Sequence, residues 1–299
     1  MLKKILPSLV ALCAGMSVAP AFAGDFLWSD TYLNYRYLWQ DKQPGTAKDV
    51  REHAINLSHA DAWDYGQNFF SLDVEQFSHQ DPSNSVTGNF NSKSTGSGEF
   101  YGLFRSTFSG NKIFATKAFA FGPIKDVGLE VGADWCTQND QFASNKKMIV
   151  VGPQFAVDMP KGFWDVSLHI AKEWNTNGFH SYDNNGNGDS SDNFDLVPEL
   201  ETSWLYPFNV GPVPLKFTGY ANVIGPKNKG SSADTKHANE YLAHPKLMVD
   251  VGAIAGGAPG KIDAGVGYEY WLNKFGSHKP DTEGTVQHAV FFEVGYHFN

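Results

Sequence analysis

The sequence is poor in cysteine, has no long apolar run beyond its first residues, and lacks an excess of positive charge. It contains two cysteines, Cys13 and Cys136, and Cys13 lies in a leader-like segment, so a processed chain would keep one thiol. One thiol excludes an intramolecular disulfide and a zinc–thiolate cluster. No run of about 18 apolar residues follows residue 23, which argues against membrane-spanning helices.

The charge balance of the chain is acidic. Removal of residues 1–23 would leave 21 Lys and Arg against 32 Asp and Glu, a formal charge of −11. Phosphate backbones bind to basic surfaces, so a nucleic acid polymer is not expected as a partner. Aromatic residues reach 14% and glycines number 30. These proportions are typical of membrane barrels, which carry aromatic girdles and small lumen residues.

The first residues have the pattern of an export signal. Lys3 and Lys4 precede an apolar run over residues 5–18, and Ala21 and Ala23 offer small side chains at the cleavage positions. This pattern predicts a secretory signal peptide over residues 1–23, followed by one domain over residues 24–299. The residue before Cys13 is large, which argues against lipid attachment there.

The C-terminal segment alternates with a period of two. One face carries Val290, Phe292, Val294, Tyr296 and Phe298, and the other face is mostly polar or small. Side chains alternate across a strand, so one face suits lipid and the other suits water. The segment predicts the closing strand of a bacterial outer-membrane barrel, with a soluble β-sandwich or jelly roll as the alternative.

Similar alternating segments recur along the chain, and most approach the nine to eleven residues that a tilted strand needs to cross the apolar layer. They are expected at residues 27–39, 51–61, 67–78, 98–108, 125–136, 147–158, 162–174, 193–206, 213–224, 246–254, 261–273 and 288–298. The sequence therefore predicts an all-β fold, a transmembrane antiparallel β-barrel of twelve strands. Ten or fourteen strands are the alternatives.

The connectors test this interpretation. An even strand number places both termini in the periplasm, and short inner turns should alternate with long outer loops. Short connectors rich in turn residues occur at 159–161, 207–212 and 255–260, and long polar connectors at 79–97, 175–192 and 225–245. The alternation holds except at 109–124, which is long for an inner turn.

Charged residues of the expected strands should face inward, because a charge facing lipid at mid-membrane costs roughly 2–4 kcal/mol. The candidate substrate-pathway residues are Arg36, Asp73, Glu75, Tyr101, Arg105, Glu130, Asp134, Asp165, His169, Glu199, Glu201, Lys216, Tyr220, Asp263, Glu269 and Trp271. Glu99, Glu173 and Glu293 share this parity.

Carboxylates outnumber cations among these residues, which disfavours anionic permeants such as nucleotides and favours neutral polar molecules. Tyr101, Tyr220 and Trp271 offer rings on which a flat base could stack, at roughly 1–3 kcal/mol per base. The alternative for each residue is a structural ion pair that braces the barrel.

Two short motifs resemble a known family. The run Phe121-Gly-Pro-Ile-Lys-Asp126, which follows Arg105-Ser-Thr-Phe-Ser109, and the run 68–75 after Trp63 look like the corresponding regions of the nucleoside-specific channel-forming porins of the Tsx type. The layout of twelve strands over the whole mature chain is also similar. The resemblance implies a narrow monomeric barrel that lets nucleosides and deoxynucleosides cross the outer membrane. Several members of that family serve as phage or colicin receptors.

The predicted function is facilitated diffusion of small neutral solutes, above all nucleosides, through a monomeric barrel surrounded by outer-membrane lipid. No cofactor and no metal are expected. The first alternative is a surface receptor or adhesin, of the phage or colicin receptor kind, with little specific transport. The second is an outer-membrane hydrolase. An enzyme is not expected, because Ser167 and His169 share a strand face at roughly 6–7 Å, too far for direct proton transfer.

Two further features carry weaker expectations. Residues 183–189 space oxygen ligands as the start of a calcium loop does, but the twelfth position is Phe194 where a Glu is required, so a solvated loop is favoured over a calcium site. His53 and His59 fall on the apolar parity of their strand and are expected at the membrane interface rather than as metal ligands.

Overall fold

The structure is a computed structural model that describes residues 26–83, 95–176, 178, 191–227 and 238–298. Its strands are β1 (Trp28–Asp41), β2 (Val50–Trp63), β3 (Gly66–Phe77), β4 (Gly98–Ser109), β5 (Ile124–Gln138), β6 (Lys147–Val157), β7 (Phe163–Thr176), β8 (Ser191–Asn193), β9 (Val197–Val210), β10 (Val213–Ile224), β11 (Glu240–Asp250), β12 (Ile262–Leu272) and β13 (Val286–His297). The described residues also form three short helical turns, α2 (Gly110–Ile113), α3 (Val251–Ile254) and η3 (Lys274–Gly276). The predicted signal peptide and residues 183–190 of the calcium-like loop lie outside the described residues.

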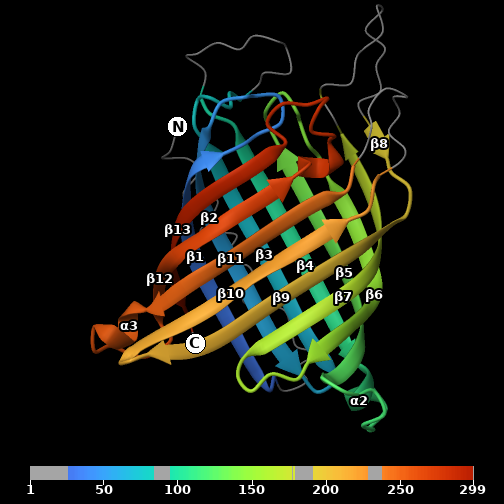
Figure 1. Cartoon of the computed structure of the whole chain (residues 1–299), viewed down its shortest axis with the longest axis vertical. Helices are drawn as coiled ribbons and strands as arrows, with labels where there is room; N and C mark the ends of the chain where they lie inside the picture. Colours follow the sequence, from blue (N-terminus) through green and yellow to red (C-terminus); the bar gives the residue numbers. More distant parts are fainter. Residues whose placement is uncertain (1–25, 84–94, 177, 179–190, 228–237, 299) are drawn as a thin grey trace, which may run out of the picture.

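The strands form a closed antiparallel barrel. Each strand from β1 to β7 and from β9 to β13 pairs with its neighbours, β1 pairs with β13, and the β6–β7 pairing completes the ring (Figure 1). Within the described ranges this makes twelve barrel strands, and the three-residue β8 adds only a short extension beside β7. Closure satisfies the backbone hydrogen bonds of every strand, which a lipid environment requires. The predicted fold class is confirmed.

Several predicted boundaries are wrong. The strand expected at 246–254 is β11, which begins at Glu240 and ends at Asp250, and the last four expected residues form the turn α3. The strand expected at 193–206 begins at Val197 and continues to Val210, so the inner turn expected at 207–212 shrinks to Gly211 and Pro212. Gly211 has φ +59°, as a two-residue hairpin with glycine first requires. Sequence hydropathy could not place these ends, because proline and polar residues continue inside the strands.

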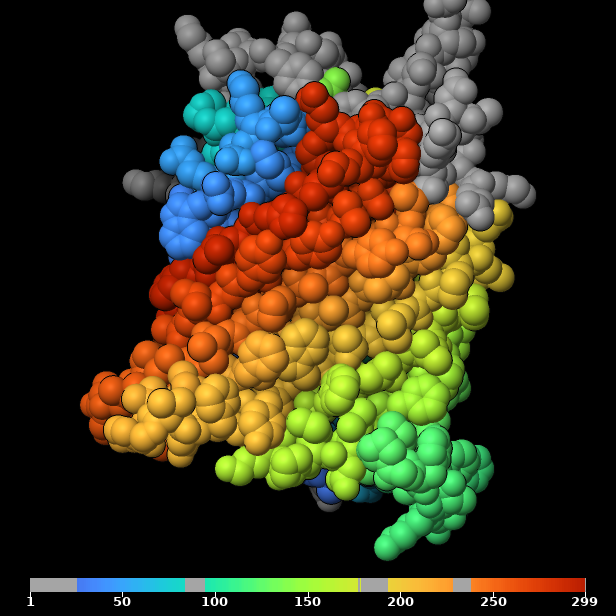
Figure 2. All heavy atoms as spheres, viewed as in Figure 1, coloured from blue at the N-terminus to red at the C-terminus, as the bar shows by residue number. Residues whose placement is uncertain are grey.

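The exterior of the barrel is apolar. Outward apolar side chains of the strands, among them Ile55, Ile149, Leu168 and Val266, are 50–55% exposed. Figure 2 shows the continuous outer face that β9 to β13 form. Rings flank this belt at both ends, as in aromatic girdles: Trp39, Trp135 and Trp174 at one end, and Trp28, Trp164 and Phe298 at the other. A closed barrel with such an exterior is an outer-membrane barrel, and its place is the bacterial outer membrane.

The two ends of the barrel differ in their connections. One end of the barrel carries α2, α3, the turn Gly211–Pro212, the first residue of β1 and the last residue of β13, and we call it the turn end (Figure 1). We call the opposite end the loop end. The long inner connector expected at 109–124 is present as α2 and the segment that leads into β5. No helix among the described residues is long and apolar enough to cross a membrane. His53 and His59 face outward, where His53 bonds Tyr35 and His59 bonds Thr31. Their place at the membrane interface stays a prediction.

Candidate lumen site

The predicted pathway residues all lie on the inner face of the barrel, where most are buried among other polar side chains. Arg36, at the middle of β1, shows how they pair: its guanidinium lies 3.3 Å from Glu52, 3.6 Å from Asp73 and 3.2 Å from Glu75. One cation thus holds three carboxylates from β2 and β3. Sequence parity placed Arg36, Asp73 and Glu75 correctly on one face, but it could not show that they contact one another.

A second cation crosses the lumen. Arg105 on β4 donates to Glu201 on β9, with Nη2–Oε2 at 2.7 Å, and its Nη1 lies 2.5 Å from Asp134 on β5. Strands β5, β6 and β7 separate β4 from β9 in the sheet, so the Arg105–Glu201 bridge spans the interior. Gln67 on β3 makes a similar crossing to Asp165 on β7, at 2.9 Å. These bridges narrow the lumen and brace its walls.

The loop end of the lumen is filled by buried ion pairs, which we call the loop-end plug: Asp41, Glu173, Lys227, Glu240 and Lys274. Lys227 lies 2.6 Å from Glu173 and 3.0 Å from Glu240, and Lys274 lies 3.0 Å from Asp41. All five side chains are at most 4% exposed. Burial by itself would lower the pKa of Lys274, but the carboxylates of Asp41 and Glu269 raise it above its ordinary value.

Sequence reasoning missed the lysines of this plug. Lys227 and Lys274 follow the ends of β10 and β12, so no strand periodicity could assign them to the lumen. Lys246, which lies 2.6 Å from Glu293, was missed because the expected strand began at that residue. The excess of inward carboxylates over cations is therefore smaller than the sequence predicted, because these lysines neutralise several of the carboxylates.

Two of the three aromatic residues predicted to stack a solute are engaged elsewhere. The Tyr101 hydroxyl donates to Asp134 at 2.9 Å, and its ring contacts Lys146. Trp271 donates Nε1–H to Glu240 at 2.9 Å and packs against Phe275 beside the plug. Both rings brace the barrel wall rather than face open space.

Tyr220 is different. Its ring stacks on His244 of the neighbouring strand, with centroids 5.0 Å apart and planes 7° apart. His244 is 1% exposed and bonds Glu269, so this pair lies inside the barrel. Tyr220 is nevertheless 41% exposed. An inward ring can keep that exposure only where the lumen is hollow, so open lumen space adjoins Tyr220.

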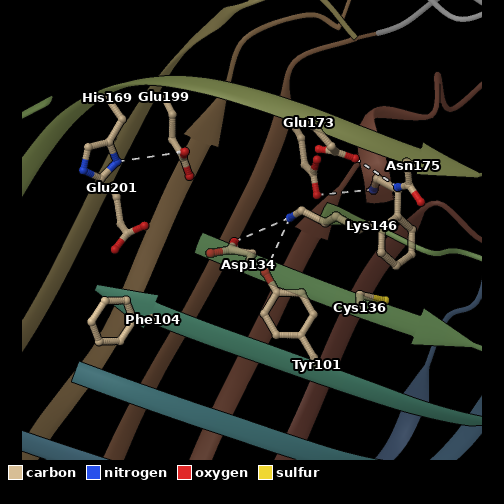
Figure 3. A network of polar contacts seen from close by, with 12 residues as sticks. Tyr101, Phe104, Asp134, Cys136, Lys146, His169, Glu173, Asn175, Glu199 and Glu201 are labelled. Carbon is tan, nitrogen blue, oxygen red and sulfur yellow. Dashed lines mark hydrogen bonds and ion pairs between the residues drawn. The ribbon is translucent and has the colours of Figure 1, made fainter. Parts of the chain in front are cut away.

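A group of acceptors on β7 and β9 has no full set of partners. His169 and Glu199 lie opposite each other in the strand register, and Glu201 follows on the same face (Figure 3). Ligand atoms of these three residues lie within 4.8 Å of one another. His169 Nδ1 and both Glu199 carboxylate oxygens are buried and accept no hydrogen bond from any described residue.

Two acidic residues face each other outside the strands at the loop end. Asp81 and Asp140 are 5% and 1% exposed. Burial and then the neighbouring Asp140 carboxylate raise the pKa of Asp81 to about 8, and burial raises the pKa of Asp140 to about 6. This pair therefore holds a proton at neutral pH.

Comparison with known proteins adds no family. No family model and no curated protein matches the chain. Among solved structures, the KdgM porin in complex with disordered oligogalacturonate is 11% identical with a TM-score of 0.42, over 90% of this chain and 99% of that one. The NanC porin is 12% identical with a TM-score of 0.42 over the same shares.

Another similar structure is an outer membrane channel from Pseudomonas putida F1, 10% identical with a TM-score of 0.44, over 94% of this chain and 100% of that one. The translocator domain of the autotransporter NalP from Neisseria meningitidis is 14% identical with a TM-score of 0.39, over 99% and 95%. These structural neighbours include outer-membrane porins and channels. The resemblance to nucleoside-specific channels stays a prediction from the sequence motifs.

Proposed function

We propose that the barrel is a monomeric outer-membrane channel for facilitated diffusion of small neutral solutes, with nucleosides and deoxynucleosides as preferred permeants. The observation that carries this proposal is the inward ring of Tyr220, which is 41% exposed and stacked on His244. A base that enters the lumen would find one preformed aromatic surface beside open space. Stacking of roughly 1–3 kcal/mol binds a base without trapping it.

Polar groups near Tyr220 would hold the sugar. His244 links Tyr220 to Glu269, whose carboxylate also accepts from Gln287. The Arg36 cluster of β1 to β3 faces the same space, since Arg36 lies 6.0 Å from the ring centre of Phe291, which itself contacts His244. A neutral nucleoside would exchange hydrogen bonds with these carboxylates and with Arg36. A nucleotide would bring two negative charges into a lumen that already carries many carboxylates. Charge repulsion would therefore disfavour its passage.

Single-channel recording with added nucleoside tests the proposal. Adenosine should interrupt the ion current of the natural protein, and Tyr220→Ala should weaken this block by roughly 5- to 100-fold, the equivalent of one stacked base. Tyr220→Phe should keep it, because the ring remains. Tyr268→Ala removes a similarly exposed tyrosine from the lipid face and is the matched control. Equal block in Tyr220→Ala and Tyr268→Ala would contradict the proposal.

One observation favours a second function, a surface receptor with little transport. The loop-end plug is densely packed, with Lys227, Lys274 and Glu173 each at most 2% exposed. If the plug stays in place and blocks the loop end, the outer loops would be the functional part. Liposomes that carry the protein separate the two functions. Nucleoside flux above that of sugars of equal size supports the channel, whereas closed liposomes that still adsorb a phage or colicin support the receptor.

A further inference from the structure

We propose that His169, Glu199 and Glu201 form a binding site for one divalent transition-metal ion inside the lumen, with Zn²⁺ as the best-matched metal. The sequence assigned no metal to this chain. The site is independent of nucleoside permeation, because it lies on β7 and β9 and does not include Tyr220.

The first argument is the unsatisfied burial of Glu199. Its side chain is fully buried, and neither carboxylate oxygen has a hydrogen-bond partner among the described residues. A buried carboxylate without partners is costly, and proteins normally pair such a group or place a metal beside it. The nearest basic side chain is His169, whose Nδ1 lies 4.0 Å from Glu199 Oε2, beyond hydrogen-bond distance. Figure 3 shows the Glu199 carboxylate directed at that imidazole.

The second argument is the orientation of His169. Its Nε2 lies 2.9 Å from Glu130 Oε1. An ionised carboxylate only accepts, so Nε2 carries a proton, and in the neutral form of the ring Nδ1 presents its lone pair to Glu199. Glu130 is itself held by Thr107 at 2.7 Å and by Gln154 at 2.6 Å. This carboxylate–histidine arrangement is the one that orients histidine ligands in metalloproteins.

The third argument concerns Glu201 and charge. Arg105 contacts Asp134 and Glu201, and Lys146 contacts Asp134. The basic side chain in contact with Glu130 is His169, and none lies within hydrogen-bond distance of Glu199 among the described residues. A divalent ion would supply the positive charge that Glu199 lacks. Glu201 has room for it, because its two oxygens offer about four acceptor positions and the contacts from Arg105 occupy three.

The ligand set indicates the metal. One imidazole nitrogen with two carboxylates suits Zn²⁺, whereas Ca²⁺ and Mg²⁺ prefer oxygen ligands alone. Zinc bonds of roughly 2.0–2.2 Å in a tetrahedral site place ligand atoms about 3.3–3.6 Å apart. The present separations of up to 4.8 Å close by rotation of the two glutamate side chains, while the paired strands hold the backbone. Three protein ligands leave the fourth position open to water or to a solute.

Equilibrium dialysis of Zn²⁺ against the untagged, EDTA-treated barrel in detergent tests the proposal. The natural protein should bind about one Zn²⁺ per chain, and His169→Gln and Glu199→Gln should each weaken binding by more than roughly 100-fold. Glu130→Gln should weaken it by roughly 10- to 100-fold, the usual effect of removing a group that orients a ligand. Equal binding in the natural protein and Glu199→Gln, or no binding to the natural protein, would overturn the site.

The chain offers a matched control. His297 also lies between two carboxylates, at 2.8 Å from Asp30 and 3.1 Å from Asp263, but both of its ring nitrogens are occupied. His297→Gln should therefore leave Zn²⁺ binding unchanged, and a loss there would also contradict the assignment. X-ray absorption at the zinc edge needs no variant: a single imidazole with oxygen ligands is expected, and several imidazoles or an all-oxygen shell would refute it.

Discussion

The loop-end plug and the middle of the lumen are built from the same residue types, yet they differ in how completely those residues are paired. In the plug, Lys274 and Asp41 are 2% and 1% exposed and in direct contact. In the middle, Tyr220 keeps 41% exposure and Glu199 has no hydrogen-bond partner among the described residues. Complete pairing makes the plug part of the fold. Incomplete pairing leaves the middle able to bind something that the chain does not supply.

The largest effect is expected in the plug. Lys274→Met leaves the Asp41 carboxylate buried without its cation, which should lower the free energy of unfolding by about 3–5 kcal/mol. Urea unfolding in detergent, followed by tryptophan fluorescence, measures this change. The double variant Lys274→Met with Asp41→Leu should recover most of the loss, because no uncompensated charge remains. If the single variant is as stable as the natural protein, the plug does not brace the fold.

A smaller effect is expected at the cross-lumen bridge. Arg105→Gln removes charged hydrogen bonds to Asp134 and Glu201, but Asp134 keeps Tyr101 and Lys146 and Glu201 is partly exposed. The free energy of unfolding should fall by about 1.5–3 kcal/mol. Single-channel conductance should rise, since the bridge spans the interior. An unchanged conductance would show that the narrowest part of the pathway lies elsewhere, for example in the plug.

The unpaired carboxylates should behave in the opposite way from the plug. Glu199→Gln removes a buried charge that has no hydrogen-bond partner, so the free energy of unfolding should be unchanged or higher in metal-free buffer.

The double variant Glu199→Gln with Glu201→Gln should weaken discrimination against nucleotides by roughly two-fold per charge removed. This is the scale of the interaction between two unit charges about 10 Å apart in water. Planar-bilayer reversal potentials and nucleotide flux measure this. Unchanged selectivity would mean that these residues do not set the filter.

The smallest effect concerns pH at the loop end. The pKa of Asp81, raised to about 8, exceeds its ordinary value, so the folded state binds more protons than the unfolded chain. Stability from this pair is therefore complete below about pH 4 and is lost as pH rises through about 8. The segment can open locally, so the effect on global unfolding should be small. The hydrogen-exchange protection factor near Asp81, which corrects the exchange rate for the intrinsic base-catalysed rate, should fall between pH 6 and 8, and Asp81→Asn should remove that fall.

The sequence predicted the inner face well and the contacts on it poorly. Parity alone placed Arg105, Asp134 and Glu201 inside the barrel, because a charge that faces lipid is too costly. It could not show that Arg105 reaches Glu201 across three intervening strands. It also missed His244, the stacking partner of Tyr220, because β11 begins six residues before the expected strand.

The sequence by itself determined a series of strands that each have one apolar and one polar face. Alternation with period two fixes which side chains contact lipid and which contact water. It therefore determined the barrel class and the polarity of both surfaces. Only the tertiary structure decided which inward groups neutralise one another. That depends on strands distant in sequence and on lysines in connectors, as Lys274 with Asp41 and Arg105 with Glu201 show. Closure of the ring brings these groups together, and no local pattern encodes it.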